Sequence, residues 1–265
     1  MSKKVAIVTG GTSGIGRATA LALQENGYTV YELSRRAEGM PDIRHIVADI
    51  TKEETLQAAV EQVLAAEGRL DLVVNNAGFG ISGAIEFTDT QEAQRLFDTL
   101  FFGMVRMNRC VIPLMRQQGH GRIVNISSVA APVPIPFQAY YSAGKAAINA
   151  YTMALANELR PFGVTVCAVM PGDIKTGFTA ARHKIIDGDD IYQGRIGRSV
   201  QRMEHDEQTG MDPVKVGRYI AAVASREGSH HPLYATRIDY KFFVFLTKVF
   251  PARFLNWLIY QLYGK

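Results

Sequence analysis

Apolar residues fall into short runs along the first two thirds of the chain, and stretches with helical spacing separate many of these runs. An apolar run of about four to eight residues between turn residues is typical of a strand that is buried on both faces. Alternation of such strands with helices predicts an α/β fold with a doubly wound parallel sheet. Because no linker, repeat or low-complexity segment divides the chain, we predict a single domain over residues 1–265. The predicted strands are Val5–Thr9, Thr29–Ser34, Arg44–Asp49, Leu70–Val74, Arg122–Ile126 and Val164–Met170.

A glycine-rich loop follows the first strand. Gly10, Gly14 and Gly16 stand between that strand and a helix whose apolar spacing covers residues 17–26. Glycine allows positive φ angles and close approach of a ligand, and a helix N-terminus presents free N–H groups to an anion. The spacing differs from the commonest dinucleotide fingerprint, and a plain glycine turn is the alternative. We predict a phosphate-binding loop made of Gly10, Thr12, Ser13, Gly14, Ile15 and Gly16.

Tyr141 and Lys145 stand four residues apart in the sequence Tyr-Ser-Ala-Gly-Lys. On a helix this spacing places both side chains on one face, and an ammonium beside a phenol lowers the phenol pKa from its ordinary value of about 10. Tyr141 could then exchange protons near neutral pH. Ser127 and Ser128 close the preceding strand and could hydrogen-bond a substrate oxygen. Because such spacing also arises by chance, a surface pair of small energetic worth is the alternative.

Several motifs occur in a fixed order: Thr9-Gly10-x-x-x-Gly14-Ile15-Gly16, Asn75-Asn76-Ala77-Gly78, Ser128 with Tyr141 and Lys145, and Pro171-Gly172. As a set they resemble the signatures of the short-chain dehydrogenase/reductase family, which includes steroid and carbonyl reductases. The resemblance covers about the first 180 residues and implies a Rossmann-type domain, a nicotinamide cofactor, and hydride transfer to a carbonyl or from an alcohol.

The resemblance also implies the roles of three catalytic residues. Tyr141 is the general acid/base, Lys145 lowers its pKa and anchors the ribose, and Ser128 polarises the substrate oxygen. The family spacing of thirteen residues before the tyrosine selects Ser128 over Ser127. Tyr140 is a competing phenol, but its offset of five residues turns it away from the face of Lys145.

The second strand ends in Ser34-Arg35, where family members that use NAD carry an aspartate at the position of Ser34. An arginine suits the 2′-phosphate of NADP, so we predict NADP as the cofactor; a solvated turn residue is the alternative for Arg35. Asp49 and Ile50 resemble the family's segment beside the adenine, although Asp49, like Thr51, could instead cap the next helix. The resemblance assigns cofactor binding to Gly10, Thr12, Ser13, Gly14, Ile15, Gly16, Ser34, Arg35, Asp49, Ile50, Asn76, Ala77, Gly78, Tyr141, Lys145, Pro171, Gly172, Ile174 and Thr176.

Two features depart from the family pattern. Leu100, in a helix predicted over Thr90–Met115, occupies the place of an asparagine that holds a relay water in the family, and leucine has no hydrogen-bonding group. Asn108 cannot replace it, since eight residues displace it by about 12 Å along a helix. The connection between Arg36 and the third strand, residues 37–43, is too short for a crossover helix. We expect cofactor binding to survive, whereas the turnover rate depends on how the relay water is held.

Two segments are candidates for substrate recognition. Pro132, Pro134 and Pro136 stiffen a loop with apolar residues between them, which suits a hydrophobic substrate and ordinary packing equally. Residues 177–212 are glycine-rich, charged and weakly periodic, and we predict that they form a substrate lid. The predicted function is NADP(H)-dependent interconversion of a carbonyl and a secondary alcohol, on a hydrophobic substrate such as a steroid or retinoid. The alternative, which Leu100 motivates, is a dinucleotide-binding regulatory or scaffold protein with weak turnover.

Composition limits other functions. The two cysteines, Cys110 and Cys167, lie in apolar surroundings, so buried thiols are expected rather than a disulfide or a metal site. The first strand begins within a few residues of Met1 and leaves no room for the apolar region of a signal peptide. We therefore expect a cytoplasmic protein that acts on a small molecule.

Residues 241–265 form a tail that is dense in large apolar side chains and contains four basic residues and no acid. Pro251 interrupts it, and it contains no run of about 18 apolar residues that could cross a bilayer. Packing on its own domain, or on a second subunit of a homodimer or homotetramer, is one interpretation. A peripheral membrane contact is the other. A basic tail this short gives no case for nucleic-acid binding.

Overall fold

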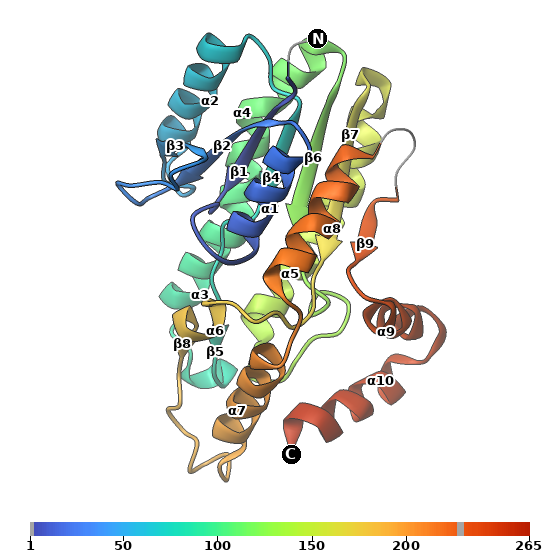
Figure 1. Ribbon diagram of the computed structural model, residues 1–265. Helices are drawn as coiled ribbons and strands as arrows, with labels where there is room; N and C mark the ends of the chain where they lie inside the picture. The colour runs from blue at the N-terminus through green and yellow to red at the C-terminus, as the bar shows by residue number, and fades with distance from the viewer. Residues whose placement is uncertain (1–2, 227–230) are drawn as a thin grey trace.

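The central element of the computed structural model, which describes residues 3–226 and 231–265, is a parallel sheet of seven strands (Figure 1). The strand order β3-β2-β1-β4-β6-β7-β9 puts the first strand third in the sheet, and the chain builds outward on both sides of it. This confirms the predicted Rossmann-type doubly wound sheet. In sheet order the strands are β3 (Arg44–Val47), β2 (Thr29–Ser34), β1 (Val5–Thr9), β4 (Leu72–Asn75), β6 (Gly121–Ile126), β7 (Val164–Met170) and β9 (Leu233–Ala235).

Strand β1 shows why the predicted strands are apolar at nearly every position. Ala6 and Val8 pack into one hydrophobic core with α1 and α8, whereas Val5 and Ile7 pack into a second core with α2, α4 and α5. Successive side chains of a strand point to opposite faces, and helices cover both faces here. All four side chains are therefore buried. The covering helices are α1 (Gly14–Glu25), α2 (Glu53–Glu67), α4 (Gly103–Gln118), α5 (Ala139–Leu159) and α8 (Pro213–Ser225).

The helix predicted over residues 90–115 is interrupted. It consists of α3 (Thr90–Phe97), a π-helical segment (Asp98–Phe102) and α4. Asp89 caps α3, since its side chain accepts a hydrogen bond from the N–H of Gln91 at 2.8 Å. A π-helical segment inserts an extra residue and rotates the side chains that follow it. The predicted absence of a helix between β2 and β3 is confirmed, because residues 35–43 contain none.

The C-terminal part of the chain contains elements that the sequence pattern did not predict. The segment 177–212 holds a short helix α6 (Phe178–Ala181), strand β8 (His183–Lys184) and helix α7 (Arg195–Gln208). Strand β8 pairs with β5 (Ile81–Ser82) beside the main sheet. Short 3-10 turns occur at Ile85–Phe87 and Arg160–Phe162. The tail folds as α9 (Ile238–Val249), α10 (Ala252–Ile259) and a π-helical turn (Tyr260–Gly264), and it lies beyond β9 at the lower right of Figure 1.

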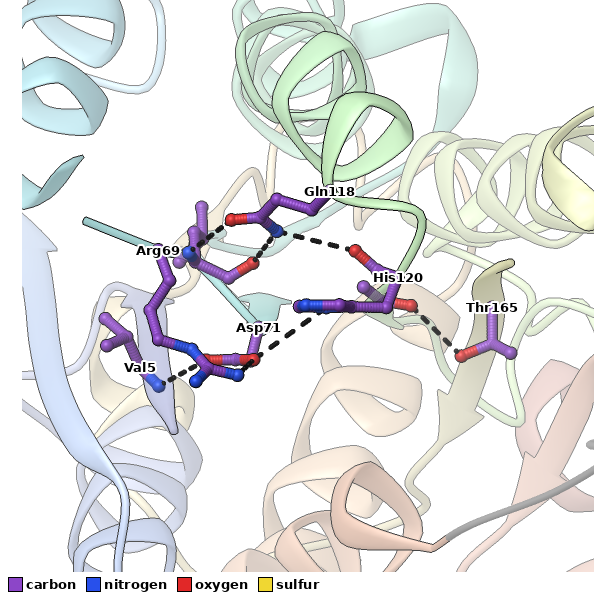
Figure 2. Close-up of polar contacts among 8 residues, drawn as sticks. Val5, Arg69, Asp71, Gln118, His120 and Thr165 are labelled. Carbon is purple, nitrogen blue, oxygen red and sulfur yellow. Dashed lines mark hydrogen bonds and ion pairs between the residues drawn. The ribbon is translucent and has the colours of Figure 1, made fainter. Parts of the chain in front are cut away.

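A polar network closes the amino-terminal ends of the central strands (Figure 2). The carboxylate of Asp71 accepts hydrogen bonds from the N–H of Val5 at 2.8 Å and from Arg69 Nε at 2.9 Å. Gln118 donates to the carbonyl oxygen of Leu70 at 2.8 Å and accepts from its N–H at 3.1 Å. These contacts join β1, the start of β4 and the end of α4, so the edge of the sheet opposite the cavity described next is fixed by hydrogen bonds.

Candidate active site

The carboxyl ends of the central strands open onto a cavity of about 1190 Å³. Ligands of open α/β sheets bind at this edge, where the strand order reverses. Every predicted cofactor-binding or catalytic residue lines the cavity except Gly16. The fold thus brings together residues from distant parts of the chain. They are Gly10, Thr12, Ser13, Gly14, Ile15, Ser34, Arg35, Asp49, Ile50, Asn76, Ala77, Gly78, Ser128, Tyr141, Lys145, Pro171, Gly172, Ile174 and Thr176.

The glycine loop between β1 and α1 is shaped to approach a ligand closely. Gly10 and Gly14 have φ angles of 66° and 54°, which side chains disfavour. Gly16 has a different role, because a Cβ there would lie 2.3 Å from the carbonyl oxygen of Gly10. It lets α1 start directly against the loop. Ser13 makes no side-chain capping bond to α1, so the N–H groups of the first turn remain available to a phosphate.

Asn76, in the motif after β4, fixes this loop. Its side chain donates to the carbonyl oxygen of Thr9 at 3.0 Å, and its backbone N–H donates to Thr9 Oγ1 at 3.0 Å. Asn75 has a structural role, since its side chain donates to Asn108 Oδ1 at 2.7 Å and to Asn125 Oδ1 at 2.9 Å inside the fold. Asn108 is therefore held away from the cavity, as its spacing from Leu100 predicts.

The far end of the cavity carries the groups predicted to hold the adenosine part of the cofactor. Ser34 Oγ is buried and has no hydrogen-bond partner among the described residues, and Arg35 is exposed beside it. Asp49 Oδ1 accepts from the N–H and the hydroxyl of Thr51 at 2.9 and 2.8 Å. Burial raises the pKa of Asp49, but the bonds from Thr51 and the nearby Arg35 bring it below its ordinary value. Neither Asp49 nor Thr51 caps α2, whose N-cap is Lys52.

These features fit a nicotinamide dinucleotide. The glycine loop offers backbone N–H groups for the phosphates, Ser34 offers a hydroxyl that lacks a partner, and Arg35 offers a positive charge.

Tyr141 and Lys145 lie one turn apart on α5, and both line the cavity. Lys145 Nζ lies 5.6 Å from the centre of the Tyr141 ring and donates a hydrogen bond to the carbonyl oxygen of Ile126 at 2.7 Å. Lys145 is only 5 % exposed. Its amino group is thus held between Ile126, the last residue of β6, and the phenol.

The geometry favours Ser128 and Tyr141 over their neighbours. Ser127 Oγ donates to the carbonyl oxygen of Lys145 at 3.1 Å and serves packing, whereas the side chain of Ser128 hydrogen-bonds the phenol of Tyr141. Tyr140 packs against the hydrophobic cluster that contains Leu100 and does not line the cavity. A hydroxyl and a phenol therefore meet at one point, where a substrate oxygen could accept a hydrogen bond from each.

The pKa of Tyr141 corrects one expectation from the sequence. Burial raises it to about 12, while the hydrogen bond with Ser128 and the charge of Arg182 oppose this shift. Burial also lowers the pKa of Lys145, to about 7, which weakens the positive charge beside the phenol. A desolvated phenol keeps its proton at neutral pH, which suits proton donation to a carbonyl oxygen.

Leu100 lies in the π-helical segment and is 2 % exposed. It lines the cavity and packs with Ile81, Leu96 and Ile185. A Cβ on Gly144 would lie 3.6 Å from it, within van der Waals contact. The position of the family's relay asparagine is thus part of an apolar cluster, and Lys145 uses a backbone carbonyl as its partner instead.

Several cavity residues were missed by the sequence analysis. Asp173, Phe178 and Glu207 line the cavity near Tyr141, and the Phe178 and Tyr141 ring centres are 5.8 Å apart. The carboxylate of Glu207 pairs with the buried Arg182 and accepts from Thr179 Oγ1 at 2.6 Å. Residues 177–212 therefore supply charged as well as apolar groups to the end of the cavity that holds Tyr141.

A periodic signal for one of these residues was present in the sequence. Ile196, Val200 and Met203 recur at helical spacing and form the buried side of α7. Glu207 follows four residues after Met203, so it lies on the same side. Asp173 and Arg182 carry no such pattern, because they lie in connections whose course depends on the rest of the fold.

Comparison with known proteins agrees with the geometry. Residues 4–185 match the model of the short chain dehydrogenase family, so the chain belongs to this family of oxidoreductases, which act on CH–OH groups. The chain is similar to a 3-ketodihydrosphingosine reductase of Bacteroides thetaiotaomicron, with 37% identity over 97% of this chain and 94% of that protein. It is also similar to the crystal structure of a short-chain dehydrogenase from Streptomyces avermitilis, with 34% identity, a TM-score of 0.82 and 92% of each chain covered.

Similar structures contain both forms of the nicotinamide cofactor. ElxO with NADP bound shows 26% identity and a TM-score of 0.75, covering 90% of this chain and 99% of that chain. A 3-ketoacyl-(acyl-carrier-protein) reductase from Brucella melitensis, complexed with NADH, shows 28% identity and a TM-score of 0.74, covering 88% of this chain and 96% of that chain. The likeness supports a nicotinamide dinucleotide and leaves the choice between NAD and NADP to the residues of this chain.

Proposed function

We propose that this protein is an NADPH-dependent reductase of long-chain ketones that carry an amino group next to the carbonyl. The observation that carries the proposal is the placement of Ser128, Tyr141 and Lys145 in the same cavity as the glycine loop and Arg35. A nicotinamide cofactor bound along this cavity would supply a hydride to the carbonyl carbon.

The side chains of the chain would supply the proton and hold the substrate. Tyr141 donates its proton to the carbonyl oxygen, and the Ser128 hydroxyl donates a hydrogen bond to the same oxygen. Lys145, fixed by the carbonyl oxygen of Ile126, positions the ribose and supports reprotonation of the phenol. Phe178 packs beside the phenol and helps to exclude water from this end of the cavity. In this proposal residues 177–212 act as a lid.

The choice of NADP rests on the end of β2. Arg35 is a charged partner for a 2′-phosphate, and Ser34 replaces the acid that would repel one. Glu32, the acid earlier in the strand, is buried against His45 and does not line the cavity.

Two observations support the substrate class: the similarity to the Bacteroides reductase and the acidic residues that line the cavity. 3-Ketodihydrosphingosine, which gives the Bacteroides relative its name, is a long-chain ketone with an amino group beside the carbonyl. Asp173 and Glu207 line the cavity near Tyr141, and Arg182 pairs with Glu207. Two carboxylates against one guanidinium leave an excess of negative charge, which would attract an ammonium group next to the reacting carbon. These charges favour an amino ketone over the steroid or retinoid suggested by the sequence.

Cofactor oxidation with matched substrates tests the proposal. NADPH and NADH consumption would be measured with 3-ketodihydrosphingosine, a long-chain ketone without the amino group, a ketosteroid and retinal. We expect the highest kcat/KM with NADPH and the amino ketone. Equal turnover of the ketone without an amino group would refute the substrate class, and a preference for NADH would refute the cofactor.

Leu100 supports a second candidate function, a dinucleotide-binding protein with little turnover. Its side chain fills the relay position with apolar groups. This candidate predicts NADPH binding, measured by fluorescence, without consumption of NADPH with any substrate of the panel.

We also propose that the protein is cytoplasmic and forms a homodimer or homotetramer, as expected from the sequence. Among the described helices, none has the length and apolar character needed to cross a membrane. Sedimentation equilibrium would give the number of subunits.

A further inference from the structure

Helix α9 turns its apolar side outward. Ile238, Phe242, Phe245 and Val249 recur at spacings of four, three and four residues, and 56–86 % of each side chain is exposed. This spacing places them on one side of the helix. A helix that packs on its own domain buries such a side, yet none of the residues of α9 is buried. The packing of the tail on its own domain therefore leaves a large apolar surface uncovered.

Helix α10 extends the same kind of surface. Phe250, Phe254 and Trp257 recur at helical spacing and are 43 %, 43 % and 56 % exposed. The rings of Phe250 and Phe254 lie 5.2 Å apart, and those of Phe254 and Trp257 lie 6.1 Å apart. We call the seven residues named here, Ile238, Phe242, Phe245, Val249, Phe250, Phe254 and Trp257, the apolar tail surface. Aromatic side chains of this kind sit well at the boundary between lipid headgroups and acyl chains.

From residue 241 to residue 265 the tail carries charges of one sign. Lys241, Lys248, Arg253 and Lys265 are exposed, and residues 241–265 contain no acid. The acids next to these residues already have partners: Asp239 of α9 pairs with Arg237, and Asp206 accepts a hydrogen bond from Tyr263 at 3.0 Å. Apolar side chains rimmed by lysine and arginine match an anionic lipid surface, where each basic residue adds to the attraction.

The same charges argue against a second copy of the chain on this surface. A two-fold contact brings identical patches together, so the four basic residues of one tail would face the four of the other. Like charges at an interface oppose association. A bilayer with anionic headgroups meets no such repulsion.

The tail is tied to the end of the cavity that holds the catalytic tyrosine. Tyr240 of α9 accepts from the N–H of Asp173 at 2.9 Å, and Tyr263 donates to Asp206 Oδ2 at 3.0 Å. Arg195 Nε of α7 donates to the carbonyl oxygen of Gly264 at 2.6 Å. Asp173 lines the cavity, so a membrane held by the tail would lie near the end of the cavity that holds Tyr141.

We propose that the apolar tail surface docks the protein on the surface of a bilayer that contains anionic lipids, with α9 and α10 lying in the headgroup region. The docking is independent of the reduction proposed above, since it requires neither cofactor nor substrate. It would let a long-chain substrate pass from the bilayer to the cavity without crossing water.

Vesicle flotation of the full chain tests the docking. The vesicles would consist of phosphatidylcholine alone or of phosphatidylcholine with phosphatidylglycerol. A triple variant, Phe242→Ser with Phe245→Ser and Trp257→Ser, removes three side chains that are 56–58 % exposed. The matched control, Val47→Ser with Ile85→Ser and Ile191→Ser, removes three side chains that are 58–67 % exposed elsewhere on the molecule. Thermal unfolding would show that both variants fold.

We expect the unaltered chain and the control variant to float with the anionic vesicles, and the triple variant to lose at least about tenfold in partitioning. Replacing Lys241, Lys248 and Arg253 with glutamine should weaken binding to the anionic vesicles and leave binding to phosphatidylcholine alone unchanged. Failure of the unaltered chain to float would overturn the proposal. So would a lower molecular mass of the triple variant in sedimentation, because the surface would then be an interface between subunits. Reduction of a short ketone by the triple variant separates this result from any failure of the proposed reaction.

Discussion

The Cδ2 atom of Leu100 lies 2.4 Å from the position that a Cβ on Gly78 would occupy. The leucine therefore fills the space that the glycine leaves open, beside the motif that follows β4. This contact explains how the chain accommodates a leucine at the relay position, because the glycine of the family motif gives it room.

Leu100→Asn should destabilise the fold without restoring a relay. An amide in this apolar cluster loses packing and gains no partner, so we expect the free energy of unfolding to fall by about 2–4 kcal/mol. Urea unfolding and NADPH consumption would be measured together. Leu96→Asn, in the same cluster but away from the cavity, is the control for lost stability. A large rise in turnover for Leu100→Asn alone would favour the non-catalytic function for the unaltered chain.

Tyr141→Phe should abolish turnover and leave NADPH affinity nearly unchanged. In the proposed reaction the phenol supplies the proton, whereas the glycine loop and Arg35 would hold most of the cofactor. Tyr140→Phe is the matched control, because this neighbour lies on α5 outside the cavity lining. Turnover would be followed by NADPH absorbance and affinity by fluorescence. Activity retained by Tyr141→Phe would disprove its role as general acid.

Lys145 should make the stability of the fold depend on pH. Its pKa is 10.5 ordinarily and about 7 in the fold, where burial disfavours the charge. Between these values the unfolded chain carries a proton that the folded chain lacks. The free energy of unfolding should therefore rise with pH across this window, and this contribution should vanish in Lys145→Met. Urea unfolding of both proteins at pH values near 7 and near 10 measures the difference. A difference that is constant or falls with pH would contradict the buried, neutral lysine.

Arg35→Gln should weaken NADPH far more than NADH. Loss of one charged partner of a phosphate corresponds to roughly 1.5–3 kcal/mol, so KM for NADPH should rise about tenfold or more. KM for NADH should change little. Arg226→Gln, which removes an equal charge from an exposed position at the end of α8, is the control. Equal effects on both cofactors would assign Arg35 to the solvated turn instead.

Glu207→Gln should act on amino ketones alone. The neutral amide keeps the shape of the side chain but not the charge that would attract an ammonium, so KM for 3-ketodihydrosphingosine should rise about tenfold. KM for the long-chain ketone without the amino group should stay the same. Glu204→Gln, which also loses an ion pair but does not line the cavity, serves for comparison. Parallel changes with both ketones would mean that Glu207 only supports Arg182.

The sequence predicted the sheet well, and its candidate cofactor-binding residues line one cavity apart from Gly16, because both depend on local patterns. A strand such as Val5–Thr9 must be mainly apolar because helices cover both faces of the sheet. The loop Gly10–Gly16 needs glycines because two of them have positive φ angles and a Cβ on Gly16 would clash with the carbonyl oxygen of Gly10. The catalytic residues also share a short stretch of chain. The sequence missed β9, α7 and α8, although Val216, Ile220 and Val223 of α8 are buried at helical spacing.

The remaining errors concern effects that only three-dimensional packing creates. The spacing of Tyr141 and Lys145 suggested a lowered phenol pKa, but burial raises the pKa of the phenol and lowers the pKa of the amine. Arg182 and Glu207 meet only because α6 and α7 fold over the cavity. Such contacts have no signature along the chain.

The hydrogen bonds of Asp71, Val5 and Gln118 hold the amino-terminal ends of the central strands together, at the end of the sheet away from the cavity. Residues 177–212, the proposed lid, could be exchanged for a new substrate while these hydrogen bonds hold the strands in register. Heat tolerance could thus be engineered at the amino-terminal ends of the strands, and substrate range at their carboxyl ends, without one change affecting the other.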